Sequence, residues 1–322
     1  MIDRRALVAG LACAPWASAS RAQAYPARPV GLIVPFPAGG PADLVARIVK
    51  EEMERRLGQP VVVDNRGGAG GTLGAGLVAA APPDGYQIGL ISTGAVTILP
   101  HLMTTLRYDP LRDLVPIGLA ITTPQILVVA PGLGVANVAD LVARARARPG
   151  ELNYGSAGIG SSLHMAGELF RLKAGVAVTH VPYRGAAPAL ADLIGGRIQF
   201  MLADAPAFLS QIQAGALKGL GVTGKRRLAV LPEIPTMEEA GFDVVCETWY
   251  GLMAPKGTPE PALARLTDAL AAALATPTIR ERLEGQGGLV ATPDRAAFAA
   301  YIRADYARWG DVVKTAGIKL DP

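Results

Sequence analysis

Residues 30–43 read VGLIVPFPAGGPAD, an apolar run followed by a glycine-rich turn and then by a helical pattern. Residues 152–164, LNYGSAGIGSSLH, repeat this order of strand, turn and helix. Each turn lies where a helix begins, and a helix N-terminus has unpaired backbone N–H groups and a partial positive charge that attract an anion. Neither turn contains Lys or Arg, so main-chain groups and the hydroxyls of Ser156, Ser161 and Ser162 are the expected donors. Two such turns facing each other predict a binder of small organic anions with a carboxylate at one or both ends.

The N-terminus has the order of an export signal. A basic pair at residues 4–5 precedes a stretch of small apolar residues, and residues 22–24 (AQA) have the small-x-small form of a signal-peptidase site. The apolar stretch is too short to span a membrane. We therefore expect a signal peptide over residues 1–24, cleavage near Ala24 and Tyr25, and export to a bacterial periplasm by either the Sec or the twin-arginine route.

The composition limits the classes of protein to which this chain can belong. Half of the 322 residues are hydrophobic, which is ample for a large core. The 31 Lys and Arg residues nearly balance the 27 Asp and Glu residues, so no clustered basic face for nucleic acid is expected. Once the leader is removed only Cys246 remains, which leaves no internal disulfide and predicts a buried thiol.

Apolar strand patterns alternate with helical patterns from Val30 onward, which is typical of a mainly parallel α/β sheet. An αβ block over about 125–248 is embedded between flanking parts, and no Pro/Gly-rich linker separates them. This organisation predicts two chain crossings and a hinged cleft, with residues 25–124 and 249–322 in lobe 1 and residues 125–248 in lobe 2. The expected strands are 30–34, 61–63, 88–91, 126–130, 176–181, 198–202, 217–222 and 248–254, and the expected helices are 43–57, 137–148, 163–173, 185–194 and most of 259–317.

Motifs for catalysis, nucleotides or metals are weak. Residues 67–71 look like a phosphate loop, but no Gly-Lys-Ser/Thr follows them. The three histidines, His101, His164 and His180, lack the spacing of a zinc site, and the chain has no Gly-x-Ser-x-Gly elbow. We expect no catalytic residue, no cofactor and no metal, and we expect Trp249 and Tyr250 to pack the hinge.

Motifs spread along the mature chain resemble the Bug-type substrate-binding proteins of tripartite tricarboxylate transporters. Each motif is weak alone, but together, in order and with their spacing kept, they are specific. They are VPFPAGG (34–40), GQPVVVDNR (58–66), GAGG (68–71), PDGY (83–86), YGSAGIGS (154–161), VPYRG (181–185), LPEIPT (231–236) and WYGL (249–252).

The resemblance implies a type II periplasmic-binding-protein fold, with two α/β lobes around a hinged cleft. It also implies a monomeric receptor without catalysis or cofactor, which takes a small carboxylate and passes it to membrane permease subunits. The family's ligand-contacting turns match two sets of positions here. The first set is Phe36, Ala38, Gly39, Gly40 and Asp43, and the second is Ser156, Ala157, Gly160, Ser161 and Ser162.

Two further positions bear on which ligand is bound. Arg184 stands where the family commonly has lysine, and a cleft-facing arginine could hold a second carboxylate. Asp204 resembles an acidic position of the family, and in the cleft it would repel a dicarboxylate but attract an amino group. The leading hypothesis is a receptor for a monocarboxylate, a dicarboxylate or an amino acid. The alternatives are a periplasmic enzyme that acts on a carboxylate with Asp43 or Asp204 as base, and a structural or partner-binding module.

Overall fold

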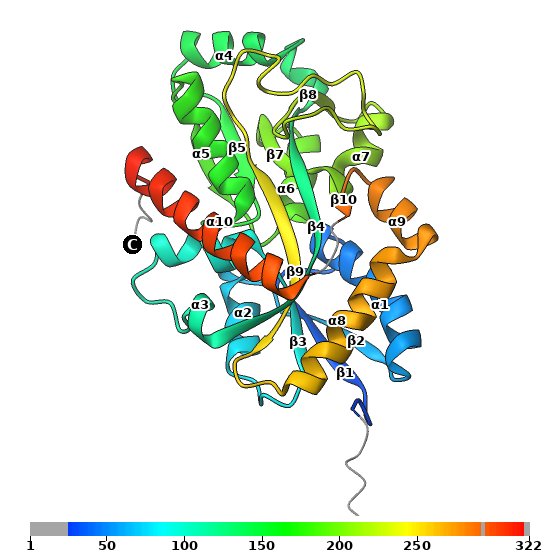
Figure 1. Cartoon of the computed structure of the whole chain (residues 1–322). Coiled ribbons are helices and arrows are strands. Elements are labelled where there is room, and N and C mark those ends of the chain that lie inside the picture. Colours follow the sequence, from blue (N-terminus) through cyan, green and yellow to red (C-terminus); the bar gives the residue numbers. More distant parts are fainter. Residues whose placement is uncertain (1–24, 291–293, 319–322) are drawn as a thin grey trace, which may run out of the picture.

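The computed structural model describes residues 25–290 and 294–318, so the expected signal peptide lies outside the described residues (Figure 1). A ten-stranded sheet runs through the molecule in the order β2-β1-β3-β9-β4-β7-β5-β6, with β8 and β10 also paired to β4. Within the described ranges, every helix is too short or too polar to cross a membrane.

The first half of the sheet carries helices on both faces. Apolar side chains of the strands pack on one face against α1, α8 and α9, and on the other against α2. These elements are β1 (Val30–Val34), α1 (Pro41–Leu57), β2 (Val61–Asn65), α2 (Thr72–Ala79), β3 (Gln87–Ser92), α8 (Glu260–Ala275) and α9 (Pro277–Glu284).

The second half has the same layered arrangement. Helices α4 and α5 cover one face of its strands, and α6 and α7 cover the other. These elements are α4 (Val138–Ala147), β5 (Asn153–Ser156), α5 (Ser162–Ala174), β6 (Thr179–Pro182), α6 (Ala186–Ile194), β7 (Phe200–Asp204), α7 (Ala205–Gln213) and β8 (Lys218–Val222).

Two long strands join the halves. β4 (Leu114–Val129) pairs antiparallel with β9 (Glu247–Pro255) along the first half, and its last residues pair antiparallel with β7 and β8 of the second half. β9 in turn pairs antiparallel with β3. The expectation of a mainly parallel sheet is therefore wrong. Among the strands that the structure describes, parallel pairing is confined to β1 with β2 and β3, and to β5 with β6 and β7, because the crossing strands run against their neighbours.

Local signals placed the ends of most expected elements within two or three residues, but β4 begins at Leu114 and not near the expected residue 126. Gly58 ends α1 in the left-handed region (φ 69°), where glycine has no steric cost. The side chains of Asn137 and Ser161 accept backbone N–H bonds at the starts of α4 and α5. The short elements are η1 (Ala69–Gly71), η2 (Gly94–Ile98), η3 (Leu99–His101), α3 (Pro110–Asp113), η4 (Pro131–Leu133) and β10 (Leu289–Val290).

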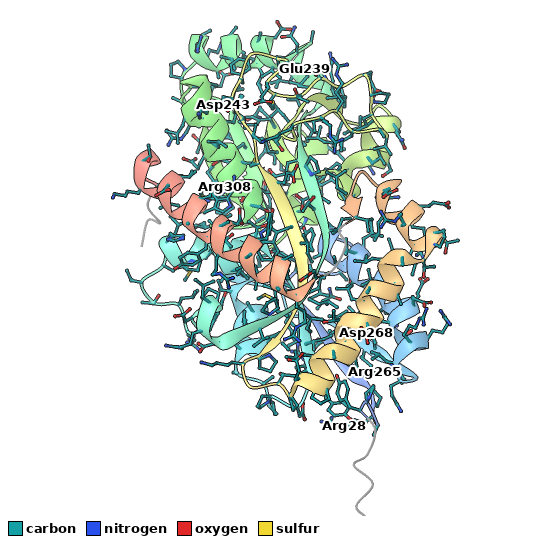
Figure 2. The ribbon with its side chains drawn as sticks, viewed as in Figure 1. Arg28, Glu239, Asp243, Arg265, Asp268 and Arg308 are labelled. Carbon is teal, nitrogen blue, oxygen red and sulfur yellow. The ribbon has the colours of Figure 1, made fainter. Side chains whose placement is uncertain are left out.

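The C-terminal helix α10 (Arg295–Ala316) packs against both halves. Phe298 lies with Trp249 in the apolar cluster of the first half, whereas Trp309 and Val313 lie in the cluster around α4 and α5. Arg28, Arg265 and Asp268 lie toward one end of the molecule, and Glu239 and Asp243 lie toward the other (Figure 2), where they pair with Arg227 and Lys173.

A buried carboxylate ties α10 to the crossing strand. Asp305 is 5% exposed, and its Oδ2 accepts hydrogen bonds from Trp249 Nε1 (2.9 Å) and Thr97 Oγ1 (2.8 Å). Its Oδ1 accepts from Arg308. If this carboxylate were removed, the buried Trp249 Nε1 would lose its partner and Thr97 Oγ1 would be left with Thr93 O as its acceptor, whereas the exposed Arg308 could turn to solvent.

We expect Asp305→Ala to lower the free energy of unfolding by about 3 kcal/mol, because it leaves a buried donor unsatisfied. Urea unfolding followed by tryptophan fluorescence measures this change. Asp311→Asn, on an exposed position of the same helix, is the control and should stay within about 0.5 kcal/mol of the parent. Equal stability of the two variants would contradict this role of Asp305.

Candidate functional site

A small cavity lies where the two sheet halves face each other. Its walls come from the turn after β1, the end of β3, the turn after β5, the start of α6, the end of β7 and the middle of β9. The lining residues are Phe36, Pro37, Gly40, Pro41, Ala42, Ser92, Ala157, Ser161, Ser162, Leu163, Gly185, Ala186, Ala187, Asp204 and Tyr250. Within the described part of the chain, this lining contains no Lys, Arg or His.

Three helices begin at this cavity. Helix α1 starts after Gly40, α5 after Ser161 and α6 after Gly185, and these helices have 17, 13 and 9 residues. Gly40 and Gly185 have no side chain that could accept a hydrogen bond from the first turn. The first N–H groups of α1 and α6 therefore have no side-chain capping partner. The cavity therefore gathers several partial positive charges without any cationic side chain.

A hydrogen-bonded carboxylate shapes the first turn. Asp43 Oδ2 accepts from Gly39 N (3.0 Å) and Arg47 Nε (2.9 Å), and Asp43 Oδ1 accepts from Asn65 Nδ2 (3.1 Å). Asn65 Nδ2 also donates to Phe36 O. Burial raises the pKa of Asp43, but the hydrogen bonds from Arg47, Gly39 and Asn65 outweigh burial and lower the pKa below its ordinary value. Asp43 is thus a positioning residue for the turn and does not line the cavity.

Two stacked histidines hold the second turn. The rings of His164 and His180 lie 4.0 Å apart between centroids. His164 Nδ1 accepts from Gly160 N (3.1 Å), and His180 Nε2 lies 2.6 Å from Ser156 Oγ. Burial lowers the pKa of both histidines, that of His180 to about 3, so both rings are neutral near pH 7.

The contact between Ser156 and His180 joins a hydroxyl to a potential base, an arrangement that the sequence did not indicate. Ser156 is fully buried, and its Oγ also accepts from Gly158 N (3.1 Å). It lies outside the cavity lining. The pair therefore stabilises the turn and does not present a nucleophile to the cavity.

A buried acid faces the cavity from the end of β7. Asp204 is 1% exposed, and its two oxygens lie 2.6 Å from Thr248 Oγ1 and Tyr250 Oη. Thr248 Oγ1 also lies 2.7 Å from Ser162 Oγ. Burial raises the pKa of Asp204 to about 6, although hydrogen bonds from Thr248, Tyr250 and Gln125 act in the opposite direction.

The expected site residues fall into three groups. The first group lines the cavity: Phe36, Gly40, Ala157, Ser161, Ser162 and Asp204. The second group shapes the turns from behind: Gly39, Asp43, Ser156 and Gly160. Ala38 is exposed beside the first turn, and Arg184 lines a separate outer cavity.

Sequence reasoning missed several lining residues. Tyr250 was expected to pack the hinge like Trp249, yet its hydroxyl reaches Asp204, while Trp249 packs against Phe298 of α10. Side chains alternate between the faces of a strand, so placing Trp249 on the α10 face would have placed Tyr250 and Thr248 on the cavity face. The start of α6 at Gly185 was a second missed signal, since it repeats the glycine-before-helix pattern of α1.

The outer cavity adjoins the inner one. It has a volume of about 360 Å³, shares Phe36 and Ala157 with the inner cavity, and is also lined by residues 68–71, Leu99, Met103, Gly158, Ile159 and residues 182–184. Its walls therefore come from both halves of the molecule.

Glycines let the halves touch along this outer cavity. A Cβ on Gly70 would lie 2.5 Å from Ile159 O, and a Cβ on Gly94 would lie 2.9 Å from Gly160 O. A Cβ on Gly160 would overlap the Leu99 side chain. The glycine-rich segment 67–71 is thus a close backbone turn, and it contacts the second half.

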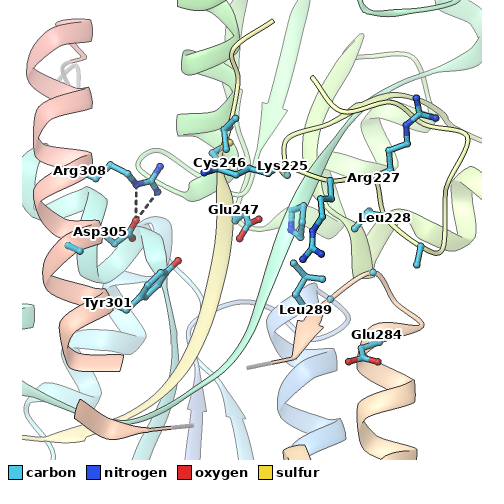
Figure 3. Close-up of a pocket in the computed structure, with 18 residues that line it drawn as sticks. Lys225, Arg227, Leu228, Cys246, Glu247, Glu284, Leu289, Tyr301, Asp305 and Arg308 are labelled. Carbon is cyan, nitrogen blue, oxygen red and sulfur yellow. Dashed lines mark hydrogen bonds and ion pairs between the residues drawn. The ribbon is translucent and has the colours of Figure 1, made fainter. Parts of the chain in front are cut away.

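A larger groove of about 840 Å³ lies on the other face of β9 (Figure 3). Lys225 and Arg227 come from the loop after β8, Glu247 from β9, and the paired Asp305 and Arg308 from α10. Cys246 also lines it but is 3% exposed, which confirms the expected buried thiol, and burial raises its pKa to about 12. The helix starts described above do not open into this groove, so the smaller inner cavity is the better candidate site for an anion.

Two sheet halves joined by crossing strands, with helix N-termini meeting at a cavity between them, define a two-lobed solute-binding protein. The sequence profile described as "Tripartite tricarboxylate transporter family receptor" matches residues 45–318. The chain belongs to this family of periplasmic solute receptors, and it has the periplasmic-binding-protein fold.

Individual relatives agree with this assignment. The chain is 40% identical to the "UPF0065 protein in tcbD-tcbE intergenic region" of Pseudomonas sp. (strain P51), over 97% of this chain and 94% of that protein. It is 37% identical to the solved periplasmic binding protein BugD, with a TM-score of 0.88 over 92% of this chain and 99% of that chain. It is 36% identical to R. palustris Rpa4515, solved with adipate, with a TM-score of 0.89 over 92% and 99% of the two chains.

We expect Asp204→Asn to change how stability depends on pH. A folded-state pKa of about 6 above the unfolded value of 3.8 means that Asp204 favours folding most below pH 3.8 and that this contribution is lost as pH rises through 6. Asparagine does not titrate. From pH 4 to pH 8 the variant should therefore gain about 2.4 kcal/mol of unfolding free energy relative to the parent.

Urea unfolding at a series of pH values measures this difference, and Asp268→Asn on the surface is the control. Any constant offset between Asp204→Asn and the parent reports the altered hydrogen bonds, so only the slope is diagnostic. A difference that stays flat across the range would contradict a titrating, buried Asp204.

Proposed function

We propose that this protein captures a small carboxylate between its two lobes and delivers it to the membrane permease of a tripartite tricarboxylate transport system. The observation that carries the proposal is the convergence of three helix N-termini on one cavity whose described lining has no cationic side chain. Backbone N–H groups in this arrangement suit a carboxylate. The adipate held by a relative of 36% identity supports the same ligand class.

We also propose where the protein is located and how its chain is divided between the two lobes. Residues 1–24 act as a signal peptide that directs the protein to the periplasm, where it works as a monomer. Lobe 1 comprises residues 25–124 and 249–322, and lobe 2 comprises residues 125–248. Membership of a transporter receptor family supports the permease as the partner that receives the solute.

Binding is coupled to closure of the lobes. Segments from both lobes line the inner cavity, so the ligand completes its contacts only when they approach. β4 and β9 serve as the hinge, and the glycine contacts around Gly70, Gly94 and Gly160 form where the lobes meet. The ligand therefore stabilises the arrangement in which these glycine contacts form.

Thermal unfolding of residues 25–322 against a panel of carboxylates tests the function. A ligand at a hundred times its Kd adds about 2.7 kcal/mol, which raises the Tm by several degrees. The matched amides, which lack the negative charge, should not raise the Tm. The protein is first unfolded and refolded by dialysis to remove any solute retained from the cell. Absence of a shift with every mono-, di- and tricarboxylate and amino acid would contradict the proposal.

We expect Gly70→Ala to weaken carboxylate binding at least tenfold without touching the inner cavity. The new methyl group would meet Ile159 O of the opposite lobe and hold the lobes apart. Gly134→Ala is the matched control, because Gly134 has a similar left-handed φ (+72° against +64°) but no neighbour within 4 Å. Calorimetry gives the affinities, and small-angle X-ray scattering with ligand gives the degree of closure. Equal affinities in the two variants would contradict closure through this contact.

A further inference from the structure

We propose that this receptor takes up one proton from solvent with each carboxylate that it binds in the inner cavity, and that Asp204 holds this proton. The inference rests on the proposed function, because it takes the inner cavity as the place of the bound carboxylate. It deepens that function by adding a proton to the bound state. It also gives Ser162 a hydrogen bond to the carboxylate that depends on Asp204.

The charge of the inner cavity is the first reason. Asp204 is 1% exposed and lines the cavity beside Ser162 and Tyr250. Over the described ranges, the lining has no Lys, Arg or His that would offset an ionised Asp204. The cavity volume of about 20 Å³ leaves room for little more than one water-sized group, so a carboxylate there lies close to Asp204. Two carboxylates that share a buried site do not both stay ionised, so the bound anion favours a neutral Asp204.

A chain of hydroxyl groups that links Asp204 to the cavity is the second reason. Asp204 Oδ1 lies 2.6 Å from Thr248 Oγ1, and Thr248 Oγ1 lies 2.7 Å from Ser162 Oγ. Gln125 Nε2 donates to the same oxygen of Thr248 (3.0 Å). A threonine hydroxyl donates one hydrogen bond and accepts two. Because Gln125 occupies one acceptor position, Thr248 accepts from one end of the chain and donates to the other.

The protonation state of Asp204 sets the direction of this chain. An ionised Asp204 only accepts, so Thr248 donates to it and the Ser162 hydroxyl donates to Thr248. An Asp204 protonated at Oδ1 donates to Thr248, and Thr248 then donates to Ser162. The Ser162 hydroxyl is thereby left to donate into the cavity. A carboxylate accepts hydrogen bonds but does not donate them, so it gains this bond only from the protonated chain.

The environment of Asp204 suits a proton that is taken up near neutral pH. Burial raises its pKa to about 6, although hydrogen bonds from Thr248, Tyr250 and Gln125 lower it. Asp204 of the free protein is therefore largely ionised at pH 7. Burial also raises the pKa of Cys246 to about 12 and that of Tyr250 well above its ordinary value, so both stay neutral.

Other titratable groups around the end of β7 are held by partners of their own. Within the described residues, β4 and α7 carry none. The groups on the remaining elements are Asp43 of α1, Tyr154 of β5, His164, Glu168, Arg171 and Lys173 of α5, and Asp192 of α6, each in a hydrogen bond or ion pair. Asp204 is therefore the group that answers to a carboxylate in the cavity.

Calorimetry in buffers of different ionisation enthalpy counts the protons taken up on binding. Residues 25–322 are titrated at pH 7 with adipate, which is ionised at both ends at this pH. If adipate does not bind, the panel carboxylate that raises the Tm most takes its place. With a pKa of about 6, Asp204 of the free parent is about 90% ionised at pH 7, so the uptake should approach about 0.9 proton per ligand.

Asp204→Asn tests the same inference through affinity. Asparagine reproduces the neutral acid, because its Nδ2 can donate to Thr248 while its Oδ1 accepts from Tyr250. The parent should bind adipate more weakly as the pH rises above 6, by up to about tenfold per pH unit. The variant should bind equally well at pH 6.5 and pH 8, and about tenfold or more tightly than the parent at pH 8. Asp268→Asn, at an exposed position, is the control and should keep the pH dependence of the parent.

Ser162→Ala tests the end of the chain that faces the cavity. In the Asp204→Asn background it should weaken adipate binding about tenfold at both pH values, because it removes one charge-assisted hydrogen bond. Ser210→Ala in the same background is the control, since Ser210 is exposed on α7. Equal affinities of the two double variants would overturn the role of Ser162.

The outcomes separate the two proposals. If the parent binds no carboxylate of the panel, the proposed function fails and this inference fails with it. If the parent binds a carboxylate without proton uptake, and with the same affinity at pH 6.5 and pH 8, the function stands and the inference is overturned. It is also overturned if Asp204→Asn binds more weakly than the parent at both pH values, because the ionised Asp204 then contributes to binding.

Discussion

The antiparallel pairing of β4 with β9 is the interaction on which the rest of the structure depends. The ladder runs from Leu114 with Pro255 to Pro124 with Glu247, and β4 then continues into pairing with β7 and β8. Each half of the sheet is thereby built on a strand that it shares with the other. Because the halves share these strands, the cavity between them lies beside the strands that join them, and no separate linker connects the described halves.

The same ladder separates two environments. Thr248 and Tyr250 lie on one face of β9 and reach Asp204, while Trp249 lies on the other and reaches Asp305. One face therefore carries the cavity that we propose as the anion site, and the other carries the contact with α10. Two buried carboxylates flank a single strand, and their surroundings differ. Asp204 is held without a cation and has a raised pKa, whereas Asp305 is paired with Arg308.

The helix N-termini are the part of the site that the sequence predicted best. A glycine turn between an apolar run and an amphipathic pattern indicates where backbone N–H groups are unpaired, so the first and second turns could be predicted as anion sites. Roles within each turn could not be predicted. Asp43 was grouped with the ligand contacts, yet it binds Gly39, Arg47 and Asn65 behind the turn. The sequence shows that a carboxylate lies in the first turn of a helix, but it does not show whether that carboxylate points into the cavity or back toward the turn.

By itself the sequence determined the alternation of strands and helices, the approximate ends of the helices expected at 43–57, 137–148 and 163–173, and the two glycine turns, because these depend on neighbours a few residues apart. Only the tertiary structure decided which way the crossing strands run and which faces they present. It also decided that Ser156 meets His180, that Gly70 meets Ile159, and that α6 begins at the same cavity as α1. These relations join segments that are distant along the chain, and their geometry follows from the packing of the two halves. No local pattern of residues carries that information.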